Sequence, residues 1–369
     1  MPHKIDTTLL INNHSNDSVS HQILQNHMAI IDAPYVYTPR KNEWSEHQWN
    51  EFNASLRDKA LNAKTEEQAW EELVKGARKV MRNYTTSFFI LTRFLPVKKR
   101  QKVEAIYAAV RYPDEIVDTF NISNQEKITQ LNIWSQYYEE ALQGKKIKEL
   151  LQQNIPPLLV GFIRVVQECK IPHHYYRAFL DAMRLDVEPV VYTNMDNLID
   201  SYIYGSAIVV GYFLAYIYGS RTPQDFPQTL DASKDLGIAL QLTNFMRDIA
   251  DDKKRKRIYI PLEFLKQAEI QIEEVFAESS KAKLKVVVNH ILDIAEDYYS
   301  KAQSRIDAFS KDSQTAIQAC IDVYRQLNDQ IRFNKDAIIN RQSVPFMRKF
   351  RVLPMSKYWR LPRAYLFGA

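Results

Sequence analysis

Residues 241–252 read QLTNFMRDIADD, a stretch that carries a polar stripe inside apolar sequence. Four oxygen-bearing side chains recur at i, i+3, i+7 and i+11 and so share one face of an α-helix: Gln241, Asn244, Asp248 and Asp252. Leu240, Leu242 and Phe245 surround this face with apolar surface, where an unpaired carboxylate is costly to bury. Carboxylate and amide oxygens arranged in this way are suitable ligands for a hard cation such as Mg²⁺.

A second acidic helix is expected earlier in the chain, where residues 111–118 read RYPDEIVD. A continuous helical stripe at i, i+4, i+7 and i+11 is formed by Tyr107, Arg111, Asp114 and Asp118. On its own, the D-x-x-x-D spacing is also typical of a surface salt-bridge stripe. Two such faces opposite one another would bind Mg²⁺ together with substrate phosphates. The pair of helices therefore predicts a site that ionises a diphosphate.

Basic residues lie within and directly after the acidic stripe at residues 241–252. Arg247 lies within it, and residues 253–261 read KKRKRIYIP. A departing diphosphate develops negative charge, which positioned cations and Mg²⁺ stabilise. Helix C-terminal charge and solvation explain Lys253–Lys256 well, but they explain Arg257 and the apolar residues after it poorly.

Two further segments carry groups that suit such a site. Ser87 and Phe88 lie where a hydroxyl near a helix start can cap the helix or hydrogen-bond a phosphate. Residues 202–211, YIYGSAIVVG, place small residues on an aromatic-rich helix. Those small residues indicate either close helix packing or a wall along which a long hydrocarbon chain can lie.

The whole chain predicts one all-α domain over residues 43–340, because prolines fall at the ends of helical patterns and no run of alternating strands appears. Helices are expected near residues 43–62, 66–82, 97–121, 125–144, 154–169, 173–188, 194–219, 230–254, 277–308 and 312–340. Residues 1–42 are polar and without period, so we expect a poorly ordered extension. With 8 glycines and no G-x-G-x-x-G or P-loop pattern, a nucleotide-binding fold is disfavoured. The 2 cysteines indicate neither a disulfide framework nor a cysteine-based zinc site, and fit a reducing compartment.

Residues 341–369 form a C-terminal extension with basic side chains and no acidic one. The basic residues are Arg341, Arg348, Lys349, Arg351, Lys357, Arg360 and Arg363. With its aromatic residues, this extension predicts contact with an anionic membrane surface; a solvated, partly docked tail is the alternative. The first 30 residues show no secretory signal pattern, and the apolar stretch 205–219 falls short of the roughly 18–20 residues of a membrane span. We therefore expect a cytoplasmic protein at a membrane periphery, without nucleic acid as a partner.

Together these residues resemble the phytoene/squalene synthase family of head-to-head (1′–1) prenyltransferases. The resemblance covers about residues 76–345 and is carried above all by the Q-L-T-N-x-x-R-D-x-x-D-D block and the R-I-Y-I-P segment. It implies a single-domain, all-α isoprenoid synthase fold with a central cavity. It also implies condensation of two identical allylic diphosphates through a cyclopropylcarbinyl diphosphate, with Mg²⁺ as cofactor and Mn²⁺ as a substitute.

The resemblance also assigns roles to individual positions. Metal ligands would be Asp114, Asp118, Asn244, Asp248 and Asp252. Diphosphate contacts would be Ser87, Tyr107, Arg111, Arg247, Arg257, Tyr259, Tyr324 and Arg341. Gln241 would lie beside the cation path, Ala207, Val210 and Gly211 would line the pocket for the hydrocarbon chain, and Tyr202 would be a further substrate-binding residue. Four departures from the family pattern leave every carboxylate in place: Thr86, Val191, Gly205 and Lys256.

The D-E-I-V-D and R-I-Y-I-P segments are most similar to the phytoene branch. The expected product is phytoene, from two geranylgeranyl diphosphates, formed by proton loss and without NADPH as the first step of carotenoid biosynthesis. Two farnesyl diphosphates giving dehydrosqualene, squalene or hydroxysqualene are the close alternative. A non-catalytic family member that acts in protein assembly is a remote one, since all four carboxylates remain. The oligomeric state stays open between monomer and homodimer.

Overall fold

The computed structural model describes residues 43–144, 146–188, 190–334 and 336–367, and within these ranges the chain is helical without a β-strand. Ser220 and Phe309 form an isolated β-bridge. The α-helices are α2 (Glu46–Leu61), α3 (Glu66–Tyr84), α4 (Thr86–Thr92), α5 (Val97–Asp118), α6 (Asn124–Ala141), α7 (Ile147–Gln152), α8 (Pro157–Cys169), α9 (His173–Leu185), α10 (Met195–Leu198), α11 (Val209–Tyr218), α12 (Phe226–Lys254), α13 (Leu262–Gln267), α14 (Lys281–Ser304), α15 (Lys311–Phe333), α16 (Phe346–Val352) and α17 (Lys357–Phe367). A π-helix, η2 (Ile199–Ile208), joins α10 to α11, and short 3-10 turns link other helices. The predicted all-α fold is confirmed.

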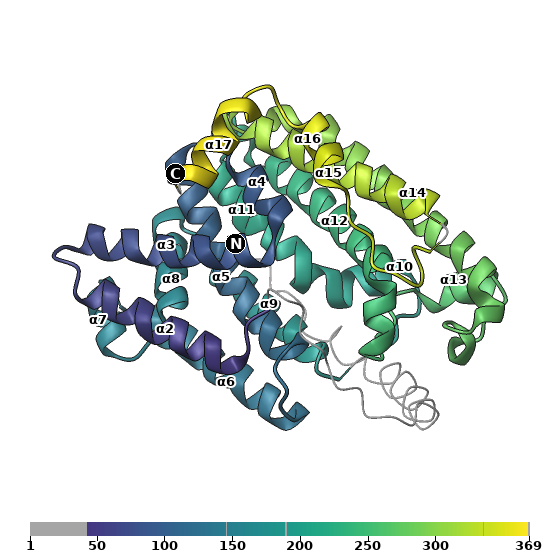
Figure 1. Ribbon diagram of the computed structural model, residues 1–369, viewed down its shortest axis with the longest axis horizontal. Helices are drawn as coiled ribbons and strands as arrows, with labels where there is room; N and C mark the ends of the chain where they lie inside the picture. The colour runs from purple at the N-terminus through teal and green to yellow at the C-terminus, as the bar shows by residue number, and fades with distance from the viewer. Residues whose placement is uncertain (1–42, 145, 189, 335, 368–369) are drawn as a thin grey trace, which may run out of the picture.

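Two groups of helices meet around the middle of the molecule (Figure 1). In one group α5 packs against α3, α8 and α9, and in the other α12 packs against α14 and α15. The segment η2–α11 contacts both groups, since it packs against α9 and α12 and α11 also contacts α5. The two acidic helices, α5 and α12, therefore lie on either side of the segment that was expected to line a hydrocarbon pocket.

Pro113 lies inside α5, directly before the first acidic residue of interest. Proline has no N–H, so the backbone carbonyl four residues earlier, that of Ala109, loses its usual helical donor. The Tyr176 hydroxyl from α9 donates to this carbonyl at 2.8 Å, and the Trp134 Nε1–H donates to the Tyr176 oxygen at 2.8 Å. This buried relay lets α5 continue to Asp118 despite the proline.

The stretch Met195–Tyr218, expected as one helix over 194–219, consists of α10, the π-helix η2 and α11. It is apolar and long enough to cross a membrane by composition, but half of its most apolar window is buried inside the protein. A Cβ on Gly211 would come within 2.6 Å of the Ser233 carbonyl oxygen of α12, and one on Gly205 within 2.5 Å of the Ala178 carbonyl oxygen of α9. Glycine is therefore required for the close packing of this segment as a core element.

The C-terminal extension is helical through α16 and α17 and packs onto the body of the protein. Leu353, Leu361 and Ala364 are buried, and α16 lies against α15. The Arg360 guanidinium donates to the Arg93 backbone oxygen at 2.9 Å. The expected N-terminal extension, residues 1–42, lies outside the described residues.

Candidate active site

A cavity of about 230 Å³ lies between α5, η2–α11 and α12, with α3, α4 and α15 contributing to its wall. Six of the expected site residues line it together: Tyr107, Ala207, Val210, Gly211, Gln241 and Asn244. Most of the remaining wall is apolar, including Phe88, Leu214 and Leu240. Side chains from three separate parts of the sequence thus converge on one apolar space, which suits a hydrocarbon chain.

Two buried oxygens interrupt this apolar wall. The Asn244 Oδ1 and the Ser206 Oγ have no hydrogen-bond partner among the described residues, and both residues line the cavity. A buried polar atom without a partner costs free energy, so such atoms are suited to meet a ligand. Asn244 is also the carboxamide that was expected to add an oxygen to a metal site.

On α5 the two aspartates are each held by arginine. Arg111 Nη1 lies 2.5 Å from Asp114 Oδ2, and Arg111 also pairs with the buried Glu115. Arg257 Nη1 lies 2.6 Å from Asp118 Oδ1, so this ion pair connects the end of α5 to the segment that follows α12. The predicted stripe on α5 is therefore ion-paired, and at Asp118 it meets the segment that follows α12.

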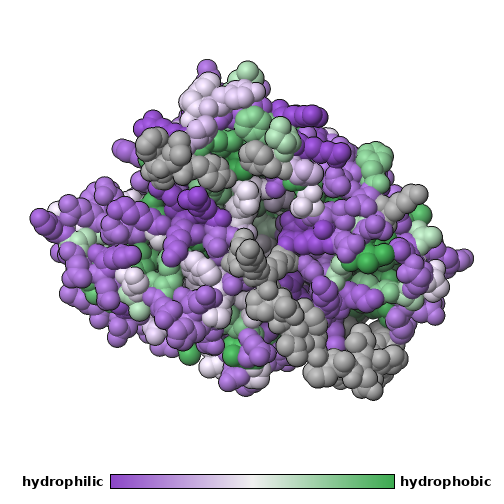
Figure 2. Space-filling view, in the orientation of Figure 1, coloured by the Kyte–Doolittle hydropathy of each residue, from purple (hydrophilic) through white to green (hydrophobic). Residues whose placement is uncertain are grey.

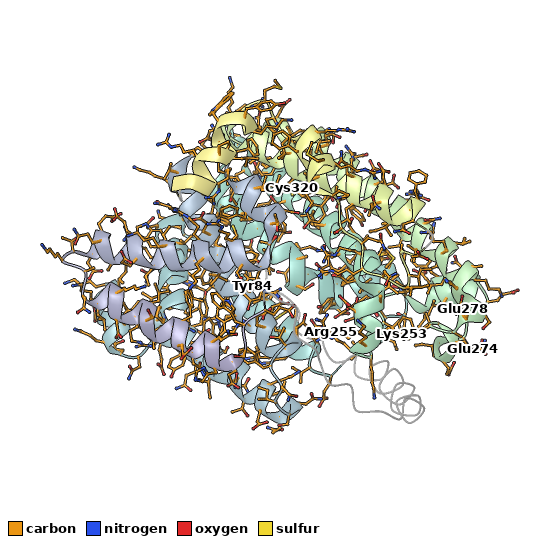
Figure 3. The ribbon with its side chains drawn as sticks, in the orientation of Figure 1. Tyr84, Lys253, Arg255, Glu274, Glu278 and Cys320 are labelled. Carbon is orange, nitrogen blue, oxygen red and sulfur yellow. The ribbon has the colours of Figure 1, made fainter. Side chains whose placement is uncertain are left out.

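The run at residues 253–257 divides into two parts. Arg255 Nη2 lies 3.5 Å from Asp118 Oδ2, whereas the Lys253 ammonium donates outward to the Phe276 backbone oxygen at 3.3 Å. Figure 3 labels Arg255 in the middle of the molecule and Lys253 nearer its edge. The interpretation of Lys253–Lys256 as terminal charge is therefore wrong for Arg255, which joins Arg257 at the site. The change of direction occurs at Lys256, whose φ of 57° is left-handed.

On α12 the aspartates meet cations from two elements. Arg247 Nε donates to Asp248 Oδ1 at 2.7 Å, and Arg341 Nε, from the C-terminal segment, donates to the same oxygen at 2.5 Å. Asp252 is buried, with 7% of its surface exposed, and it experiences the charges of Asp248, Arg257, Arg255 and Asp118. The carboxylates of both helices thus belong to one electrostatic cluster.

Burial and neighbouring charges act on these carboxylates in different directions. Burial raises the pKa of Asp114 to about 6, although Arg111 opposes the shift. Burial and the charge of Asp248 hold the pKa of Asp252 well above its ordinary range. Burial also penalises ionised Asp118, but Arg257 and Arg255 more than offset this and lower the pKa of Asp118. Extra positive charge is therefore favourable beside Asp114 and Asp252.

Asp186, just after α9, organises part of the site and was not among the expected residues. It accepts hydrogen bonds from the Tyr202 hydroxyl and, at 2.7 Å, from the Tyr259 hydroxyl. Its backbone oxygen accepts from Arg257 Nη2 at 3.0 Å. Tyr259 also stacks on Phe245 with ring centroids 4.2 Å apart. Tyr202 and Tyr259 therefore lie beside the ionic cluster rather than along the apolar cavity.

The remaining expected residues lie around the same region. Thr85, not Ser87, caps α4 by accepting from the Phe88 N–H at 3.3 Å, which leaves the half-buried Ser87 hydroxyl outside the cap. Tyr324 packs against Phe88 with ring centroids 5.8 Å apart, and its hydroxyl lies near Arg247.

Lys349 of α16 was not expected at the site. Burial and the nearby Arg247 charge lower the pKa of its ammonium. The Arg247 charge therefore acts on Lys349, and cations that repel one another favour a nearby anionic ligand. Lys349 belongs to the basic C-terminal run, but only the packing of α16 reveals its place next to α12.

The cluster supplies the donors of a magnesium site but does not form one as it stands. Across the four described ranges, no group of three acidic, histidine or cysteine side chains is close enough to hold a metal ion. Instead, Asp114, Asp118 and Asp248 form ion pairs with arginines. The donor chemistry fits Mg²⁺, because it consists of carboxylates and the unpartnered Asn244 Oδ1.

The model of the squalene/phytoene synthase family matches residues 81–353, which include the cavity and both acidic helices. The chain belongs to this family. It is 28% identical over 294 residues to the 15-cis-phytoene synthase of Synechococcus elongatus, covering 77% of this chain and 92% of that protein. It is 26% identical over 290 residues to the phytoene synthase of Arthrospira platensis, covering 76% and 91%.

Solved structures share the fold at lower identity. A crystal structure of a dehydrosqualene synthase in complex with ligand aligns with a TM-score of 0.67 at 20% identity, covering 83% of this chain and all of that chain. A squalene synthase from Alicyclobacillus acidocaldarius aligns with a TM-score of 0.61 at 19% identity, covering 74% of this chain and 97% of that chain. These similarities establish the all-α isoprenoid synthase fold for this family member.

Proposed function

We propose that this prenyltransferase condenses two geranylgeranyl diphosphates head to head to phytoene. One observation carries the proposal: an apolar cavity is lined at Tyr107, Gln241 and Asn244 by the same helices that carry the cluster of aspartates and arginines. A prenyl diphosphate has this composition, with a long apolar chain and a strongly anionic head. The relatives named phytoene synthase support the choice of product.

The reaction would proceed in two ionisations. In the first, the C1–O bond of one substrate breaks and its electrons leave with diphosphate. The allylic cation joins the double bond of the second substrate, and loss of one proton closes a cyclopropylcarbinyl diphosphate. In the second, this diphosphate leaves, the carbon skeleton rearranges to the 1′–1 linkage, and a final proton loss forms phytoene. No reductant is consumed, so no NADPH is required.

The charged residues are suited to the two departures. Arg111, Arg247 and Arg257 each lie against an aspartate of the cluster and can turn to an incoming diphosphate. Asp114, Asp118, Asn244, Asp248 and Asp252 would hold Mg²⁺, or Mn²⁺ in its place. The bound cation would neutralise charge that develops on the leaving group. The apolar wall excludes water, which would otherwise capture a carbocation as an alcohol.

A fifteen-carbon substrate is the second candidate, and one observation favours it. The cavity of about 230 Å³ is below the range of roughly 300–1,000 Å³ typical of ligand pockets. Two farnesyl chains need less additional space than two geranylgeranyl chains. Their products would be dehydrosqualene, squalene or hydroxysqualene, depending on whether the last cation loses a proton or gains hydride or water.

Product analysis distinguishes these candidates. The purified protein is incubated with Mg²⁺ and either geranylgeranyl or farnesyl diphosphate, with and without NADPH, and products are measured by mass. We expect a forty-carbon hydrocarbon without NADPH. Consumption of farnesyl diphosphate alone would contradict the choice of chain length, and accumulation of the cyclopropyl intermediate until NADPH is added would replace phytoene by squalene. No turnover of either substrate would favour the non-catalytic assembly role.

A further inference from the structure

The C-terminal segment exposes several large side chains to solvent, although the segment itself packs against the protein. Met347 is 63% exposed on α16, Met355 is 71% exposed between the helices, and Tyr358 and Trp359 are 59% and 63% exposed on α17. We call these four residues the α16–α17 patch. In the space-filling view, pale and green side chains interrupt the purple surface at the top of the molecule, over α16 and α17 (Figure 2).

The patch rests on a folded base rather than on a loose tail. Leu353, Leu361 and Ala364 point into the protein and are buried. The buried Lys357 ammonium donates to the Phe350 and Arg351 backbone oxygens at 2.6 and 3.3 Å, which ties α17 to the end of α16. Tyr358 and Trp359 are therefore exposed on one face of α17, whose other face is packed against the protein.

The charged residues of the C-terminal segment itself all have one sign. Residues 341–369 contain no aspartate or glutamate. Two basic side chains of the segment are engaged at the active site, Arg341 with Asp248 and Lys349 beside Arg247. Arg351, Arg360 and Arg363 are exposed on the same two helices as the patch or at their junction. Exposed aromatic and methionine side chains bordered by cations match an anionic lipid surface, where the rings can enter the interface and the cations meet headgroups.

We propose that the α16–α17 patch docks on the surface of an anionic bilayer. The two sides of the C-terminal segment then have different functions. Its inner side contributes Arg341 and Lys349 to the ionic cluster, and its outer side holds the protein against lipid. A substrate with a hydrocarbon tail is thereby collected next to the segment that meets its diphosphate. This last consequence depends on the proposed function, whereas the docking does not.

Vesicle binding tests the docking directly. The full chain is co-sedimented with vesicles of phosphatidylcholine alone and with vesicles that also contain phosphatidylglycerol. We expect binding to the anionic vesicles, and weakening in high salt because the interfacial potential is screened. Changing the four patch residues to serine should reduce the affinity at least tenfold. Arg351→Gln with Arg363→Gln should reduce it as well, by roughly fivefold for each cation.

A matched control uses exposed apolar residues on helices other than α16 and α17. Val286 on α14 and Ile133 on α6 are 67% and 46% exposed, and changing both to serine should leave vesicle binding unchanged. Turnover of substrate in detergent should be unaffected in all of these variants, which separates docking from catalysis. Unchanged vesicle binding by the patch variant would overturn the proposal. Equal binding to neutral vesicles, preferential binding to duplex DNA, or a dimer that the patch substitutions dissociate would overturn it too.

Discussion

Asp186 connects three parts of the sequence through a single carboxylate and its backbone oxygen. Because the carboxylate accepts from Tyr202 and Tyr259 and its charge acts on Arg257, neutralising it should disturb the guanidinium that pairs with Asp118. We expect Asp186→Asn to fold but to lose at least tenfold in kcat/KM for the prenyl diphosphate, in line with the cost of misplacing a positioned group. Diphosphate release measures the rate, and circular dichroism checks the fold.

The control for this prediction is Asp181→Asn, on α9, the helix that ends just before Asp186. Asp181 pairs with Arg184 through a side chain that is 73% exposed, and such surface pairs contribute little. Unaltered kinetics in Asp186→Asn would remove it from the positioning residues of the site.

Substitutions at Asp114 and at Asp118 are expected to change the free energy of unfolding in opposite directions in the absence of divalent metal. Burial raises the pKa of Asp114 to about 6, so the ionised carboxylate destabilises the folded state above that pH and ceases to do so as the pH falls toward 4. Asp114→Asn should therefore raise the free energy of unfolding by about 1–3 kcal/mol at pH 7.5, and by roughly a third of that near pH 4.5. Urea denaturation at both pH values measures the difference.

Asp118→Asn should change stability in the other direction at pH 7.5. Burial disfavours its charge, yet Arg257 and Arg255 lower its pKa, so the ionised form stabilises the folded state above its ordinary pKa. Replacement by asparagine should then lower the free energy of unfolding. Equal effects of the two substitutions would contradict the electrostatic description of the site.

At the scale of elements, the turn after α12 depends on one left-handed residue. Lys256 has a φ of 57°, which is unfavourable for a side chain by roughly 1–2 kcal/mol, while glycine costs about 0.4–1 kcal/mol more unfolded-state entropy. Lys256→Gly should therefore raise the free energy of unfolding by up to about 1.6 kcal/mol. Lys254→Gly, inside the last turn of α12, should lower it by about 0.5–1 kcal/mol. Thermal unfolding of both variants measures whether each substitution raises or lowers stability.

The last turns of α5 depend on the relay from α9. Tyr176→Phe would leave the Ala109 oxygen and the Trp134 Nε1–H without their buried partner. We expect a loss of about 1–3 kcal/mol in the free energy of unfolding, measured by urea denaturation. Tyr137→Phe is the control, because Tyr137 is only half-buried on α6. A neutral Tyr176→Phe would show that α5 tolerates Pro113 without the relay.

Sequence patterns predicted the elements whose periodicity is long, and with them the stripes of α5 and α12. The helices α4, α7, α13, α16 and α17 were not predicted, because their 6 to 11 residues carry too little periodicity. The π-helix was not predicted either, since its residues keep an apolar pattern that also suits an α-helix. Site roles for Asp186, Arg255 and Lys349 were not predicted for another reason. Their partners lie on other elements, so no local spacing in the sequence indicates them.

For the whole molecule, the ionic cluster joins the two helix groups. Asp118 of α5 pairs with Arg257 beyond α12, and Asp248 of α12 pairs with Arg341. Ligands that bind only the folded state raise stability by about 2.7 kcal/mol at a hundred times their Kd. Mg²⁺ with inorganic diphosphate should therefore raise the melting temperature of the protein, and much less that of Asp114→Asn with Asp248→Asn. Equal shifts in both proteins would place the binding of these ions elsewhere.

The π-helix η2 also fixes how far the cavity wall can change in length. Each of its turns holds about one residue more than an α-helical turn. The number of residues in η2 therefore fixes the direction in which its early side chains point relative to its late ones. Loss of a single residue would rotate one flank against the other by about 100°. Tyr202, which meets Asp186, and Ala207, which lines the cavity, would then no longer face their partners together. This stretch can therefore exchange side chains to reshape the wall, but it cannot be shortened or extended.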